Sequence, residues 1–214
     1  MAQQTENKFA YYLGNTMYIN VTNLCTNRCK FCIRNSGDSV GGVKLVLDSE
    51  KFSHEDVIKE VKDTFSDKCR EIVFCGYGEP LIKLEIVKNV AQFIKQNYQQ
   101  IPVRINTNGH ANLIHKRNIV PELVGLVDMI SVSLNAENAD LYAELASPAF
   151  EKSVAYEAVK DFIQECAKNG IETTATVVSG FESYKIDIKK CQEITEELGA
   201  KFRVREWLPQ GYEN

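Results

Sequence analysis

The sequence predicts an α/β fold: an open, partial (β/α)6 barrel related to the TIM barrel, in a single domain over residues 1–214. Six short apolar runs alternate with stretches of helical periodicity. Each intervening stretch is long enough for a crossover between parallel strands, and such crossovers curl a sheet in one direction. Six units are fewer than the eight that close a TIM barrel, so we expect the barrel to stay open.

The six predicted strands are short apolar runs bounded by turn residues. They cover residues 16–21, 71–75, 102–106, 129–134, 171–178 and 202–207. Ser53 gives the first helix an S/T-x-x-D/E start, and apolar side chains at helical spacing continue it to Phe65. Further helices are predicted over residues 86–94, near 121, over 137–168 in two pieces broken around 147–148, and over 188–198.

Three details of this prediction can be checked individually. Residues 1–15 are expected to form a polar leader that packs one turn against the barrel. Residues 35–50 are glycine-containing and are expected to form a long loop or a short hairpin, which would either shape a substrate pocket or cap the barrel. The second piece of the 137–168 helix is expected to bury a stripe made of Val154, Ala158, Val159, Phe162, Ile163 and Cys166.

Composition narrows the class of protein. The hydrophobic fraction of 44% and the charged fraction of 25% are ordinary for a globular domain. The net charge of -4 disfavours a nucleic-acid partner, whose phosphates attract clustered lysine and arginine. We find no apolar signal peptide and no run approaching the roughly 18 apolar residues of a membrane span. Seven cysteines without an export signal lead us to expect reduced thiols in the cytoplasm.

The most informative stretch follows the first predicted strand, where Cys25, Cys29 and Cys32 have the spacing C-x3-C-x2-C. A short loop with three thiols can ligate one metal centre. Structural zinc and a closed [4Fe–4S] cube each take four protein ligands, so three leave one metal position open for a substrate or cofactor. The alternative is a zinc site completed by a histidine, but the three histidines, at 54, 110 and 115, are all distant in sequence.

Residues 22–34 of this chain, with Phe31 just before the third cysteine, resemble the cluster loop of radical S-adenosylmethionine (radical SAM) enzymes. Residues 76–80, Gly-Tyr-Gly-Glu-Pro, follow the second predicted strand and resemble the GGEP segment of that family. The runs CTNRCKFCIR, FCGYGEPL, NTNGHANLIH and SVSLNA also resemble a small subfamily associated with TatD-type hydrolases.

The resemblance implies two cofactors and a set of contacts to them. Cys25, Cys29 and Cys32 would hold a [4Fe–4S] cluster whose fourth iron binds the amino and carboxylate groups of SAM. In the GGEP-like segment, the residues placed at the methionyl amino group are Tyr77, Gly78, Glu79 and Pro80, with Tyr77 replacing the first glycine of the family motif.

Other polar positions are candidates for the same ligand. Ser131, Ser133 and Asn135 alternate along the fourth predicted strand and so share one face. The resemblance makes Ser133 and Asn135 candidates for the SAM ribose and carboxylate; hydroxyls bonded to neighbouring strands are the plain alternative. Asn106 and Asn108 end the third strand, where they could face SAM or substrate, although Asn-Gly is also a common turn.

Apolar and charged candidates complete the predicted site. Phe31, Val178 and Leu208 would form an apolar wall for adenine, and each would equally suit a hydrophobic core. Arg104, Arg203, Arg205 and Glu206 lie on predicted strands and would either hold an anionic substrate or form surface ion pairs. The remaining cysteines, at 69, 75, 166 and 191, form no CxxC pair and are expected to be small buried hydrophobic residues. We assign no catalytic residue.

The implied function is reductive cleavage of SAM to methionine and a 5′-deoxyadenosyl radical, which takes hydrogen from a small-molecule or nucleoside-like substrate. The implied partners are an electron donor such as flavodoxin or ferredoxin and a TatD-type hydrolase, and an open cluster implies a low-oxygen setting. Two alternatives stay open. One is an activase that places the radical on a partner protein, and the other is a non-enzymatic module that holds a metal or cluster.

Overall fold

A computed structural model describes residues 7–207 of the chain. Its main sheet has seven strands in the order β1-β2-β5-β6-β7-β8-β9. From β2 to β9 all neighbours are parallel, whereas β1 is antiparallel to β2. The strands are β1 (Ala10–Leu13), β2 (Thr16–Ile19), β5 (Glu71–Phe74), β6 (Val103–Thr107), β7 (Met129–Ser133), β8 (Glu172–Ser179) and β9 (Lys201–Glu206). The predicted open, six-stranded parallel barrel is therefore confirmed.

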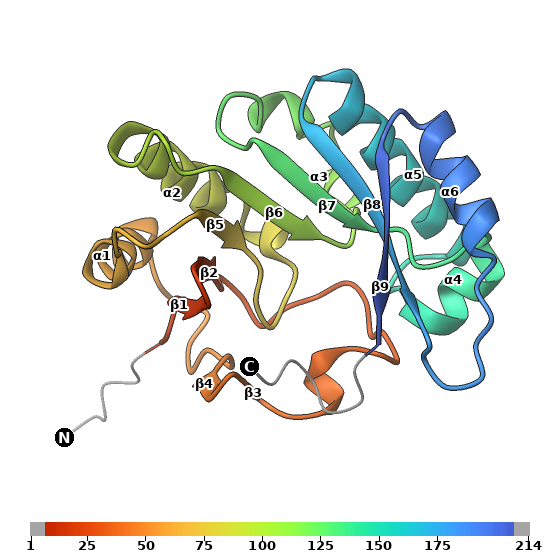
Figure 1. The fold of residues 1–214 in the computed structure, drawn as a ribbon, viewed down its shortest axis with the longest axis horizontal. Coiled ribbons are helices and arrows are strands. Elements are labelled where there is room, and N and C mark those ends of the chain that lie inside the picture. The colour runs from red at the N-terminus through yellow and green to blue at the C-terminus, as the bar shows by residue number, and fades with distance from the viewer. Residues whose placement is uncertain (1–6, 208–214) are drawn as a thin grey trace.

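The longer helices lie along the outer side of the curved sheet, and the segment between β2 and α1 crosses its open side (Figure 1). The helices are α1 (His54–Thr64), α2 (Leu84–Asn97), α3 (Ala111–His115), α4 (Ala139–Ala146), α5 (Lys152–Lys168) and α6 (Ile188–Glu197), with short 3-10 turns η1 (Ile33–Asn35), η2 (Pro80–Lys83) and η3 (Val120–Glu122). Within residues 7–207, no helix combines the length and the apolar character that crossing a membrane requires.

The hydrophobic core fills the layer between the sheet and these helices. Alternate strand residues point into it, as the two-residue period of a strand requires. Examples, all fully buried, are Met17, Ile19, Ile72, Phe74, Val103, Ile105, Ala175 and Val177. The other face of each strand is left for the inside of the barrel, where the polar candidates lie.

Three expectations need correction. The segment before residue 16 contains β1, which extends the sheet because Ala10 and Tyr11 are buried and the Glu60 carboxylate accepts the Phe9 and Ala10 N–H groups at 2.8 and 3.2 Å. Val154 is 50% exposed. It lies in the first turn of α5, and the buried stripe there begins with Ala155 and Tyr156 instead. The short helix α3 was not predicted.

The segment over residues 35–50 contains a short hairpin, β3 (Ser39–Val40) and β4 (Val43–Lys44). Its turn residues Gly41 and Gly42 both have positive φ, +54° and +77°, which is the backbone that a two-residue hairpin turn favours. Val40 and Leu45 pack with Tyr11 in a second small cluster, and Tyr77 packs against it. The hairpin thus covers one side of the barrel next to residues 76–80.

A buried carboxylate ties the end of β5 to the end of β6. Glu79 is 3% exposed, and it accepts the Leu81 N–H at 3.1 Å, the Thr107 hydroxyl at 2.8 Å and the Asn108 N–H at 2.7 Å. Burial raises the pKa of this carboxyl to about 7, while the three donors lower it. Both oxygens are engaged with the protein itself, so this side chain fixes the segment over residues 76–80 relative to β6.

We predict that Glu79→Gln destabilises the protein at pH 8, measured without added metal, where the carboxyl is ionised. The glutamine amide would turn an N–H toward groups that are themselves donors. An unsatisfied buried donor costs about 1–3 kcal/mol, which for a chain of this size corresponds to a fall in Tm of about 2–12 °C. Thermal unfolding measures this, with Glu85→Gln on the exposed face of α2 as the control. Equal Tm values for the two variants would contradict this role of Glu79.

Candidate functional site

The cysteine loop after β2 packs directly against the segment that follows β5. The Glu79 N–H donates to the Leu24 carbonyl at 2.7 Å. A Cβ on Gly78 would lie 2.3 Å from the Leu24 carbonyl oxygen and 2.5 Å from that of Thr22, which is far inside contact distance. Glycine is therefore required at 78, because the two backbones touch where a side chain would stand.

On its other side the same loop is bonded to the end of α4 and the turn after it. The Arg28 N–H donates to the Ala146 carbonyl at 2.9 Å, and the Lys30 N–H donates to that of Leu145 at 2.9 Å. The Ala149 N–H returns a bond to the Thr26 carbonyl at 2.8 Å. The three cysteines thus belong to a loop that is held between the segment after β5 and the end of α4.

The thiols of Cys25, Cys29 and Cys32 are free and partly buried. Burial raises the pKa of Cys25, and it raises the pKa of Cys29 to about 12, with smaller contributions from Cys32 and Cys25. A bound metal reverses this effect by stabilising thiolate, so the donor set suits metal ligation better than free thiolate chemistry.

The histidines are unavailable as a fourth ligand. Both ring nitrogens of the fully buried His110 are engaged, Nδ1 with the Thr26 hydroxyl and Nε2 with the Tyr142 hydroxyl, each at 3.0 Å. His115 contacts the Leu81 carbonyl at 2.8 Å, and His54 lies beside Glu55 on the surface. Among residues 7–207, no three His, Cys, Asp or Glu side chains form a site for a single metal ion. A preformed zinc site would bring its ligands to one ion, and the described residues show no such group. In a [4Fe–4S] cube each cysteine binds a different iron, so the three sulfurs need not converge on one point.

The GGEP-like segment presents its backbone rather than its side chains to the loop. The Tyr77 hydroxyl points to the Gly37 carbonyl at 3.5 Å, and Arg34 lies over its ring, so this side chain faces the hairpin. Pro80 begins η2, and the carboxylate of Glu79 is engaged as described above. Only backbone atoms of this segment remain for a ligand beside the cysteine loop.

Asn135, directly after β7, has the clearest unused polar group. It is 1% exposed, and its Nδ2 has no hydrogen-bond partner among residues 7–207. Its φ of +64° turns the chain, and its N–H is bonded to the Thr176 carbonyl at 3.1 Å. A buried donor without a partner is costly unless a ligand meets it, so Asn135 fits a cofactor-binding role.

The other predicted contacts have mixed surroundings. Ser131 is buried and Ser133 is partly buried on β7, while Asn106 already accepts a bond from Arg104 at 2.7 Å. Val178 is 5% exposed at the end of β8. Phe31 packs edge-on against Phe181 with ring centroids 5.9 Å apart, so its ring is partly used within the protein. Leu208 lies outside the described residues.

Two of the predicted arginines differ in how they are paired. Arg104 is bound by both oxygens of Glu71, at 2.8 and 2.9 Å. The Nε of Arg205 on β9 is buried and has no hydrogen-bond partner in the part of the chain that the structure describes. Burial raises the pKa of Cys75, which is partly buried at the end of β5, and the charges of Arg205 and Arg104 oppose that rise. Cys69, Cys166 and Cys191 are buried in the core, as predicted.

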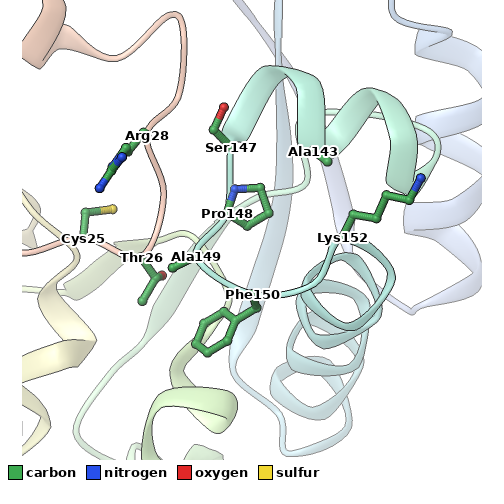
Figure 2. A pocket seen from close by; sticks show the side chains of 9 residues that line it. All are labelled: Cys25, Thr26, Arg28, Ala143, Ser147, Pro148, Ala149, Phe150 and Lys152. Atoms are coloured by element: carbon green, nitrogen blue, oxygen red, sulfur yellow. The ribbon is translucent and has the colours of Figure 1, made fainter.

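A pocket of about 500 Å³ lies between the cysteine loop and the α4–α5 turn. Figure 2 shows Cys25, Thr26 and Arg28 on the loop side, facing Pro148 and Ala149 of the turn. The complete lining is Cys25, Thr26, Arg28, Ala143, Ser147, Pro148, Ala149, Phe150 and Lys152. Sequence reasoning missed the contribution of the α4–α5 turn, because nothing in its residues signals proximity to the loop.

Comparison with known proteins identifies the family. A family model described as the radical SAM superfamily matches residues 19–189. The GTP 3′,8-cyclase of Alkaliphilus oremlandii (strain OhILAs) is 27% identical over 198 residues, which make up 92% of this chain and 57% of that protein. The chain thus spans little more than half of this curated relative.

Solved structures share the fold at low identity. SuiB of Streptococcus suis bound to its precursor peptide SuiA matches with a TM-score of 0.65 and 18% identity, over 92% of this chain and 40% of that one. TYW1 with a lysine-pyruvate adduct matches with a TM-score of 0.63 and 12% identity, over 94% and 67%. SuiB has also been solved with S-adenosylmethionine bound.

Members of this family use a [4Fe–4S] cluster and SAM, and the solved neighbours are enzymes. The three free thiols, the close glycine contact and the unpartnered Asn135 amide are consistent with those two groups. The family model covers most of the described residues, including all three cysteines. The chain therefore belongs to the radical SAM superfamily.

Proposed function

We propose that this chain is a radical SAM enzyme in which Cys25, Cys29 and Cys32 hold a [4Fe–4S] cluster. The observation that carries the proposal is a loop with three free, partly buried thiols, beside which both ring nitrogens of His110 are occupied by the hydroxyls of Thr26 and Tyr142. Three protein ligands leave one iron free for SAM. When bound and reduced, this cofactor pair supplies a 5′-deoxyadenosyl radical that takes hydrogen from the substrate. We place these residues in one radical SAM core domain over residues 1–214.

The residues of the chain bind and orient SAM in this proposal. Backbone atoms of Tyr77, Gly78, Glu79 and Pro80 lie beside the cysteine loop and bind the methionyl end. Asn135 donates its buried amide to a polar group of SAM, and Ser133, the last residue of β7, contributes its hydroxyl. Phe31, Val178 and Leu208 supply apolar contacts to adenine, and Asn106 faces SAM or substrate. A reduced cluster further implies a low-oxygen setting and a small electron-donor protein such as flavodoxin or ferredoxin.

For the substrate we propose a small anionic, nucleotide-like molecule. The pocket beside Cys25, about 500 Å³ in volume, lies in the size range of small-molecule sites. Arg28 lines it and forms no ion pair within residues 7–207, and the Arg205 Nε is also unpartnered. The curated relative is a cyclase of GTP, which supports a nucleotide-like substrate.

The alternative, a radical placed on a peptide or partner protein, is supported by the peptide in the SuiB complex. We keep the association with a TatD-type hydrolase as a proposal from the sequence.

Anaerobic reconstitution with iron and sulfide tests the cluster. We expect iron–sulfur absorption, and we expect release of 5′-deoxyadenosine from SAM when a reductant is added. Each of Cys25→Ser, Cys29→Ser and Cys32→Ser should reduce 5′-deoxyadenosine formation at least 100-fold, because a missing thiolate removes a cluster ligand. Cys166→Ala, in the buried face of α5, is the control and should keep the activity. A protein that binds zinc and takes up no sulfide would instead support the metal-holding module.

Asn135→Asp tests the SAM contact, because aspartate keeps the shape and tolerates the positive φ but lacks the N–H donors. The loss of a hydrogen bond to a charged group, worth about 1.5–3 kcal/mol, corresponds to a decrease in SAM affinity of roughly tenfold or more. Calorimetric titration of the cluster-loaded protein with SAM measures it. Asn97→Asp, at the exposed end of α2, adds the same charge far from the site and serves as control. Unchanged SAM affinity together with full iron content would remove Asn135 from the proposed site.

A further inference from the structure

A chain of buried polar side chains lies behind the cysteine loop and is attached to it at both ends. Asn108, after β6, donates from Nδ2 to the Thr26 hydroxyl at 2.8 Å and to the Cys25 sulfur at 3.7 Å. Thr26 is bonded to His110, and His110 to Tyr142, as described above. Asn27 closes the ring by donating from Nδ2 to the Tyr142 hydroxyl at 3.2 Å.

These groups are removed from solvent. Asn27 and Asn108 are 4% and 7% exposed, and His110 and Tyr142 are fully buried. The rings of Tyr142 and Phe150 lie edge-on to His110, at 6.2 and 5.4 Å. Burial lowers the pKa of His110 to about 4, so the imidazole is neutral near pH 7. A neutral ring has one donor and one acceptor nitrogen, which matches the two hydroxyl groups that it meets.

A local contact fixes the orientation of the Asn108 amide. Its Oδ1 accepts the backbone N–H of His110 at 3.0 Å, which directs its Nδ2 toward Thr26 and Cys25, and the His110 ring in turn holds the Thr26 hydroxyl. The Cys25 sulfur also receives the Asn27 N–H at 3.4 Å. Two donors therefore aim at one of the three sulfurs, one from the backbone and one from a side chain that substitution can remove.

We propose that Asn108 is a positioning residue that raises the reduction potential of the cluster through its N–H···S contact with Cys25, and that His110 and Tyr142 hold it in place. This inference rests on the proposed function. Hydrogen bonds to the sulfur ligands of a cluster stabilise its more negative, reduced state, so they make the cluster easier to reduce. None of the three residues needs to touch SAM or the substrate.

The test is a redox titration of the reconstituted cluster, followed by electron paramagnetic resonance. Asn108→Asp keeps the oxygen that accepts the backbone N–H of His110. It replaces the amide N–H group that donates to Cys25 with an oxygen that can only accept. At a fixed ambient potential we expect the ratio of reduced to oxidised cluster to fall about tenfold, equivalent to about 59 mV for a one-electron couple. Asn89→Asp, on the exposed face of α2, adds the same charge and should leave the ratio unchanged.

Tyr142→Phe is the second variant, because it removes only the hydroxyl that His110 and Asn27 share. It should shift the midpoint in the same direction by a smaller amount. If Asn108→Asp takes up no iron, the midpoint potential of Tyr142→Phe decides whether the inference holds. A purely structural role would lower the Tm of the iron-free variants and leave the midpoint of the loaded ones in place, and that outcome would overturn the inference.

The wild-type protein separates this inference from the proposed function. If it takes up no iron and sulfide, the proposed function fails before the potential can be measured. If it loads a cluster and cleaves SAM while the potential of every loaded variant equals that of the wild type, only the role of Asn108 and its supports is refuted.

Discussion

The site depends on the contact between two backbones at Gly78. The Thr22 and Leu24 carbonyl oxygens occupy the space that a Cβ would need, and the Glu79 N–H donates to the second of them. The loop that carries the cysteines is therefore placed by the end of the neighbouring strand rather than by its own residues. Glu79 extends this arrangement to β6, because its carboxylate accepts donors from Thr107 and Asn108. Three consecutive strand ends are thus joined into one support.

Burial shifts the pKa values of the thiols and of the histidine around this loop in opposite directions. It raises the pKa of Cys25 and Cys29, so these thiols are poor thiolates until a cation stabilises them. It lowers the pKa of His110, whose neutral ring can then link two hydroxyl groups. The same dry environment favours a metal centre at the sulfurs and keeps the nearest imidazole in a hydrogen-bonding role.

Much of the fold could be predicted because its signals are local. Six apolar runs with helical stretches between them predicted β2 and β5 to β9, and the spacing of the three cysteines predicted their shared loop. The first strand could not be predicted in this way, since the Tyr11-Tyr12 segment has strand structure only by pairing with β2. The exposure of Val154 was missed because helical periodicity does not say where the buried face of a first turn begins.

The sequence by itself determined the loop with three closely spaced cysteines, the GGEP-like segment after the second parallel strand and the open barrel that brings them to one edge, because each depends on spacing and period. Only the tertiary structure decided that Tyr77 faces the hairpin and that the Glu79 carboxylate is hydrogen-bonded within the protein. It also decided that Asn108 contacts the Cys25 sulfur and that His110 bonds to Tyr142 beside it. These contacts join residues 28 to 115 positions apart. No local pattern encodes such pairs, because they form only when the packing of separate strands and helices removes water from between them.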